Sequence, residues 1–158
     1  ILLCPTCHRK IDKAPDGTYS VEMLLGWKHE HEEWVNSWSE AKVFANAKEM
    51  AIEVMHLLDE NYMHFTEYGP MSESAQKNPG STAQAIWAAR KLDVLLPNNR
   101  KIMQMLETNS GFLKGALRQE AQKFKMHAEA FEGNQYDRVE EYPLFPASFQ
   151  LAITELSK

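Results

Sequence analysis

The chain has 158 residues, of which 44% are hydrophobic, enough for one domain or for a small module plus a helical domain. A formal net charge of −5 argues against a dominant nonspecific DNA-binding surface, which needs clustered Lys and Arg. The only two cysteines form one Cys-x-x-Cys pair, which excludes a disulfide framework and indicates a reducing compartment, by default the cytoplasm. No apolar run approaches the roughly 20 residues of a membrane span, so we expect no membrane partner.

The start of the chain predicts short elements. Residues 1–3 (Ile-Leu-Leu) are typical of a short strand, and residues 4–8 of a turn. Residues 15–17 (Pro-Asp-Gly) indicate a second turn. Ser20 is suited to cap a helix that we expect over residues 21–38.

The first turn carries two thiols and an imidazole, Cys-Pro-Thr-Cys-His, directly after the apolar run. Such side chains this close together indicate a metal-organised turn. Ile11-Asp12 follow the turn, and Leu25 precedes a Lys-His-Glu-His-Glu run at 28–32. Taken together, residues 1–32 resemble the second half of the motif of HNH endonucleases.

The resemblance implies which residues would bind metal. His8 stands where the last metal ligand of the HNH motif usually sits, and a divalent ion such as Mg²⁺ would there stabilise charge on the scissile phosphate. Cys4 and Cys7 resemble one of the two Cys-x-x-Cys pairs that hold a structural Zn²⁺ in many HNH domains, although a second pair would have to lie upstream. The alternatives are a turn histidine that only packs or caps, and small buried cysteines.

Three further residues of the motif have supporting roles. Asp12 could orient an imidazole or cap the following turn. Lys28 and His31 lie three apart on one side of the predicted helix and are expected to dock it on the hairpin, with a Lys28–phosphate contact as the alternative. The general-base His and the Asn of the motif are expected upstream of Ile1. We therefore expect no catalytic residue within this chain, and no activity of the chain by itself.

The remainder of the chain predicts helices. Two apolar stripes at three- and four-residue spacing predict a long helix that Ser39 caps and that ends at residues 68–70 (Tyr-Gly-Pro). A polar loop is expected over 71–80. A short helix is then expected from Ser81 or Thr82 through Leu92.

Residues 97–99 (Pro-Asn-Asn) predict a stop followed by a new helix cap. A helix capped by Ser110 is expected to end at residues 133–134, followed by an extended stretch at 142–146 and a last amphipathic helix. His127 is interpreted as a core histidine rather than a ligand. Four aromatic side chains are expected in one core: Phe65, Trp87, Phe124 and Phe131.

The sequence as a whole predicts a mainly α protein, a helical bundle over residues 39–158 with a small N-terminal ββα-metal remnant over 1–38. The resemblance implies the C-terminal part of a metal-dependent endonuclease that hydrolyses DNA, a class found in bacterial and phage-related systems, anti-phage defence included. The helical domain would contact a protein partner, dimerise or position DNA. One alternative is a helical protein–protein interaction module with a degenerate HNH remnant, and another is an adaptor stabilised by zinc at Cys4 and Cys7.

Overall fold

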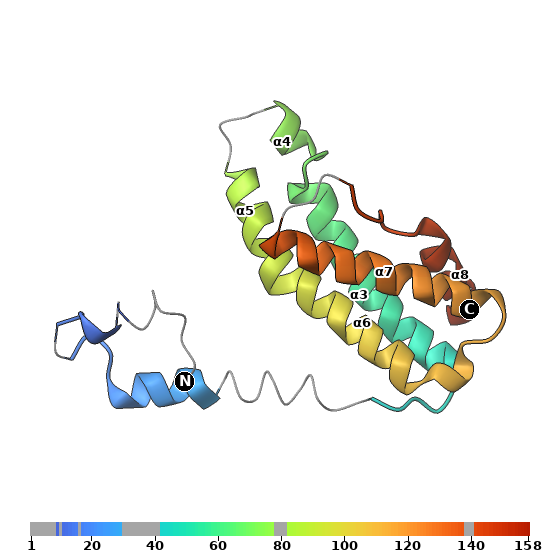
Figure 1. Ribbon diagram of the computed structural model, residues 1–158, viewed down its shortest axis with the longest axis horizontal. Coiled ribbons are helices and arrows are strands. Elements are labelled where there is room, and N and C mark those ends of the chain that lie inside the picture. The colour runs from blue at the N-terminus through green and yellow to red at the C-terminus, as the bar shows by residue number, and fades with distance from the viewer. Residues whose placement is uncertain (1–8, 10, 16, 30–41, 78–81, 138–140) are drawn as a thin grey trace. The chain divides into compact units, whose positions relative to one another are not determined.

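The computed structural model describes residues 9, 11–15, 17–29, 42–77, 82–137 and 141–158, and the chain forms two compact units, residues 1–40 and 41–158. Figure 1 shows helices in both units. No strand occurs in the described ranges, which confirms the mainly α-helical prediction. The predicted strand at 1–3, the turn at 4–8 and the boundary at 38/39 lie outside the described residues. The described residues therefore give no support to a ββα remnant.

The first unit contains the predicted turn and the predicted helix cap. Thr18 donates its backbone N–H and its hydroxyl to the Pro15 carbonyl, at 3.0 and 2.7 Å, and Gly17 adopts a φ of +84° that suits glycine. The Ser20 Oγ accepts the Met23 backbone N–H at 3.1 Å. The helix that Ser20 caps is described over residues 21–29, and its predicted end at 38 lies outside the described residues.

The second unit begins with the longest helix, α3 (Ala47–Tyr68). Asn46 caps α3, because its Oδ1 accepts the Glu49 N–H at 2.9 Å while its Nδ2 donates to the Glu49 carboxylate at 2.9 Å. The prediction that Ser39 caps this helix is wrong, since residues 42–46 are not helical. The predicted end is confirmed: a Cβ on Gly69 would lie 2.2 Å from the Phe65 carbonyl oxygen, so close approach of the backbone requires glycine there.

The polar stretch after α3 is not all loop, because it contains a short helix, α4 (Glu73–Lys77). The helix that follows was expected to stop at Pro97, and this prediction is wrong. α5 (Ala83–Arg90), one π-helical turn η1 (Lys91–Leu95) and α6 (Leu96–Thr108) follow one another without a break. The Leu96 N–H reaches back five residues to the Lys91 carbonyl, and Pro97, which has no N–H to donate, follows directly after this wider turn.

The chain then turns through a 3₁₀ turn, η2 (Ser110–Phe112), into α7 (Ala116–Tyr136). Ser110 therefore does not cap α7, which begins after Gly115 at a φ of +54°. α7 also runs through Gly133, where an end was expected. The expected last helix is present as α8 (Ala147–Ser157), after a non-helical stretch that ends at Pro146.

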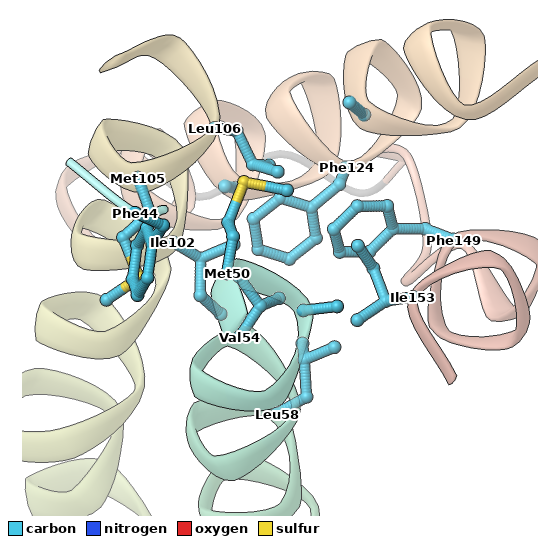
Figure 2. Packing of buried hydrophobic residues seen from close by; sticks show 13 residues of the cluster. Phe44, Met50, Val54, Leu58, Ile102, Met105, Leu106, Phe124, Phe149 and Ile153 are labelled. Atoms are coloured by element: carbon cyan, nitrogen blue, oxygen red, sulfur yellow. The ribbon is translucent and has the colours of Figure 1, made fainter. Parts of the chain in front are cut away.

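The main core of the second unit lies among α3, α6, α7 and α8 (Figure 2). Its largest fully buried side chains include Phe124 and Phe149, whose rings stack at 4.6 Å between centroids. The buried members are Phe44, Met50, Ala51, Val54, Leu58, Ile102, Met105, Leu106, Ala121, Phe124, Ala128, Phe149 and Ile153. The burial of Phe149 and Ile153 follows the amphipathic pattern expected of α8.

A second, smaller cluster holds Leu95, Leu96 and Phe131, with Trp87 and Val94 packed against it. The prediction of one core for four aromatic residues is therefore wrong. Phe124 belongs to the main core, Phe131 and Trp87 to the second cluster, and Phe65 is 43% exposed with its ring edge against Trp87. The continuous helix from α5 to α6 contributes to both clusters.

Candidate functional site

The residues predicted to bind metal, Cys4, Cys7 and His8, lie outside the described residues, as does His31. Asp12 lies in a short helical stretch, and Lys28 lies near the described end of the helix over 21–29, and both are exposed. Across the described ranges, no group of three or more His, Cys, Asp or Glu side chains could hold a metal ion. Of the predicted site residues only Asp12 and Lys28 are described, so the metal site stays a prediction.

The helix over 21–29 is apolar but is largely exposed within the described residues. Val21, Leu25 and Trp27 are all exposed, and only Leu24 is half-buried. The Trp27 ring contacts Tyr19 edge-on, with 5.9 Å between centroids. The helix that bears Lys28 therefore carries several exposed apolar side chains.

A polar layer joins α3 to α6 in the second unit, and we define it as Glu60, Asn61, Asn98 and Asn99. The Asn98 Nδ2 donates to the Glu60 Oε2 at 2.8 Å and to the Asn61 Oδ1 at 3.1 Å, while the Asn61 Nδ2 donates to the Asn99 Oδ1 at 3.0 Å. Asn98 and Asn99 are 5% and 6% exposed. Buried amides need partners, and the layer supplies them within a chain of hydrogen bonds that fixes how α3 and α6 align.

The polar layer continues into an ion pair between α6 and α7. The Arg100 Nε donates to the Glu132 Oε2 at 3.1 Å, and the Arg100 Nη2 contacts Oε1 of the same carboxylate. This two-point contact from Arg100 lowers the pKa of Glu132, against the opposing effect of burial. Three consecutive residues, Asn98 to Arg100, therefore bind α6 to both of its neighbours.

His127 has the environment of a structural histidine. Its ring lies among Phe124, Phe131 and Phe145, with centroids 5.6 to 6.5 Å away, and its Nδ1 donates to the Pro143 carbonyl at 2.8 Å. Burial lowers the pKa of His127, and the bond to Pro143 opposes that shift only in part. The imidazole therefore packs α7 against the segment before α8 in its neutral form.

A shallow pocket of about 120 Å³ lies between the end of α6 and the start of α7. Apolar side chains form part of its lining and Arg118, Gln122, Ser110, Glu107 and Lys125 the rest. Lys125 is engaged with Glu107 at 2.6 Å. The space is smaller than the several hundred Å³ of a typical small-molecule site, and no pair of groups in it is arranged as a nucleophile and base.

Sequence reasoning did not single out the polar layer or the ion pair beside it. The signal was present, because apolar residues at helical spacing continue on both sides of Pro97, at 95–96 and at 102–106. Two amides within such a stretch face a buried surface, where they need partners. Only the π turn, which lets the helix pass through the proline, has no sequence signal of its own.

Comparison with known proteins gives no relative: no family model, no curated protein and no solved structure matches this chain. In the part of the chain that the structure describes, none of the helices has the length and apolar character needed to cross a bilayer.

Proposed function

We propose that the chain is the C-terminal part of an HNH-type, metal-dependent endonuclease that hydrolyses DNA phosphodiester bonds, with an appended helical domain. The observation that carries the proposal is the run of motif residues between Leu2 and Glu32, in the order and spacing of the second half of an HNH motif. The local structure supports the proposal, because Asp12 is followed first by a turn and then by a Ser20-capped helix that bears Lys28.

The proposal assigns the chemistry to residues as follows. His8 is a ligand of a divalent ion such as Mg²⁺, which would stabilise negative charge on the phosphate. Cys4 and Cys7 are the ligands that a structural Zn²⁺ would use. Asp12 orients an imidazole or caps the following turn, and Lys28 and His31 dock the helix on the metal-binding turn. The general base is assigned to sequence that precedes Ile1, so the chain alone is proposed to be inactive.

The helical domain is proposed to contact a protein partner. Tyr62, Met63 and Phe65 near the end of α3, and Met71 just after it, are exposed apolar side chains. Aromatic residues and Met are enriched at protein interfaces, whereas Lys and Glu are depleted. The same observation supports the second candidate function, a protein–protein interaction module in which the HNH resemblance is degenerate.

The test begins with intact mass and N-terminal sequencing of the protein from its natural host. A longer species with His and Asn ahead of Ile1 supports the nuclease, and it should nick supercoiled plasmid with Mg²⁺ or Mn²⁺. His8→Ala should abolish nicking, whereas His64→Ala in α3 should leave it unchanged. A longer species that binds zinc but leaves DNA intact would replace the nuclease by the zinc-stabilised adaptor, and one that does neither would favour the interaction module.

A further inference from the structure

Residues 42–45, which we name the latch segment, precede Asn46, the N-cap of α3, without any helical structure of their own. Phe44 in this segment is nevertheless 8% exposed and belongs to the same core cluster as Met105 (Figure 2). Its neighbour Val43 is exposed. The segment therefore closes one end of the core with a single aromatic side chain.

Asn109, the residue that ends α6, holds the backbone of the latch segment. Its Oδ1 accepts the Phe44 N–H at 3.0 Å, and its Nδ2 donates to the Lys42 carbonyl at 2.8 Å. The same Nδ2 donates to the Met105 carbonyl at 2.8 Å, which fixes the side chain in place. Asn109 is 6% exposed, so one buried amide satisfies the two backbone groups that a neighbouring β-strand would otherwise pair.

The other contacts of the segment lie at the surface. The Lys42 Nζ lies 3.2 Å from the Glu53 Oε1 and 5.0 Å from the centre of the Phe44 ring. Both charged side chains are about half exposed, where solvent screens an ion pair and leaves it with little effect on stability. Among the described residues, the segment is therefore held mainly by the amide of Asn109 and by the burial of Phe44.

We propose that the latch segment opens as a unit while the helices of the second unit stay folded, and that Asn109 is the residue that controls this opening. The segment begins next to the division between the two units at residues 40 and 41. When it opens, the Phe44 ring leaves the main core and the amide of Asn109 loses its two backbone partners in the segment.

Amide hydrogen exchange on the unmodified chain tests the opening directly. The Phe44 N–H is bonded to a side chain, whereas the Ile102 N–H lies inside α6 and reports global unfolding. We expect the Phe44 amide to exchange at least tenfold faster than that of Ile102, at a rate that low urea hardly changes. Equal rates and equal urea dependence at the two amides would overturn the proposal, because the segment would then open only with the whole unit.

One variant and a matched control assign the opening to Asn109. The hydrogen bonds of Asn109 to the segment are lost both in local opening and in global unfolding, so Asn109→Ala should speed the exchange of Phe44 and Ile102 by similar factors of about tenfold or more. Asn98→Ala removes another buried asparagine of α6 and should speed the Ile102 amide while leaving the Phe44 rate unchanged. An unchanged Phe44 rate in Asn109→Ala, or a Phe44 rate that rises as much as that of Ile102 in Asn98→Ala, would overturn the proposal.

Asn109→Asp adds a readout that does not depend on loss of stability. An ionised carboxylate keeps an acceptor for the Phe44 N–H but cannot donate to the Lys42 carbonyl, whereas a protonated one can. We expect fast Phe44 exchange at neutral pH, after correction for the intrinsic pH dependence, and renewed protection as the carboxyl is protonated. Protection that does not return at low pH would contradict the role given to the Asn109 donor.

Discussion

The side-chain amide of Asn98 on α6 donates a 2.8 Å hydrogen bond to the carboxylate of Glu60 on α3, and it does so while only 5% exposed. A helix surface that packs against another helix is normally apolar. Here Asn98, which directly follows Pro97, makes the contact polar. The alignment of α3 and α6 therefore depends on hydrogen-bonded amides as well as on apolar packing.

Replacing Asn98 by alanine should lower the free energy of unfolding by about 1–3 kcal/mol, because the variant leaves the Asn61 carbonyl oxygen without its buried donor. Urea unfolding followed by circular dichroism measures the change. Gln119→Ala on the exposed side of α7 is the control and should change stability by less than about 0.5 kcal/mol. Equal effects of the two substitutions would show that the polar layer contributes nothing.

Two glycines should respond to alanine in opposite directions. Gly69→Ala places a Cβ 2.2 Å from a backbone oxygen and should destabilise the protein by about 2 kcal/mol or more. Gly133→Ala meets no atom within 4 Å inside α7 and should stabilise it by about 0.5–1 kcal/mol, through helix propensity. Thermal unfolding of the pair measures both effects. A destabilised Gly133→Ala variant would contradict the finding that α7 continues through that position.

Phe124 and Phe65 should differ strongly in their contribution to stability, although the sequence suggests one core for both. Phe124 is fully buried against Phe149, so Phe124→Ala should cost about 3–5 kcal/mol. Phe65 is 43% exposed, and Phe65→Ala should cost about 1 kcal/mol. Chemical denaturation of both variants checks the ratio, and comparable losses would mean that Phe65 is buried in solution.

The stability of the protein should fall in mild acid through His127. Burial holds the pKa of folded His127 below the ordinary value of 6.5, so the unfolded chain binds this proton more readily than the folded one. The contribution of His127 is complete above pH 6.5 and is lost as the pH falls through its lower folded pKa. His127→Gln should show a smaller decline in unfolding free energy over that window, and identical pH profiles would contradict the neutral, buried imidazole.

On the proposed function, the chain itself should not cleave DNA with Mg²⁺, Mn²⁺ or Ni²⁺, because the proposal assigns none of its residues the role of general base. A plasmid-nicking assay with the purified chain checks this expectation. Robust cleavage that disappears in His8→Ala would show that the catalytic site is complete within these residues, and the assignment of the base would then be wrong.

The sequence predicted well those features that depend on one local signal. The Pro15–Thr18 turn, the Ser20 cap, the end of α3 at Gly69 and the amphipathic α8 each follow from a few adjacent residues. Each of these signals acts through backbone geometry or a single hydrogen bond. Distant parts of the chain do not alter them.

The errors arose where two local signals competed and tertiary packing decided between them. Ser39 and Asn46 are both good caps, but only Asn46 has a glutamate three residues later, whose backbone N–H donates to the Asn46 Oδ1 and whose carboxylate accepts from the Asn46 Nδ2. Ser110 is a good cap in isolation, yet Asn109 ends α6 and a 3₁₀ turn follows. The candidate metal site could be named from the sequence alone, and its ligands lie outside the described residues.

The π turn at Lys91–Leu95 changes the direction in which the residues after it face relative to the residues before it. An α-helix advances about 100° per residue, so one additional residue in a turn rotates everything that follows by about that angle. α5 and α6 are therefore out of phase with each other, although they form one rod. Removing a single residue from this turn would restore a regular helix and rotate Ile102 and Asn98 by about 100° around the helix axis, away from α3, without altering any side chain of α6.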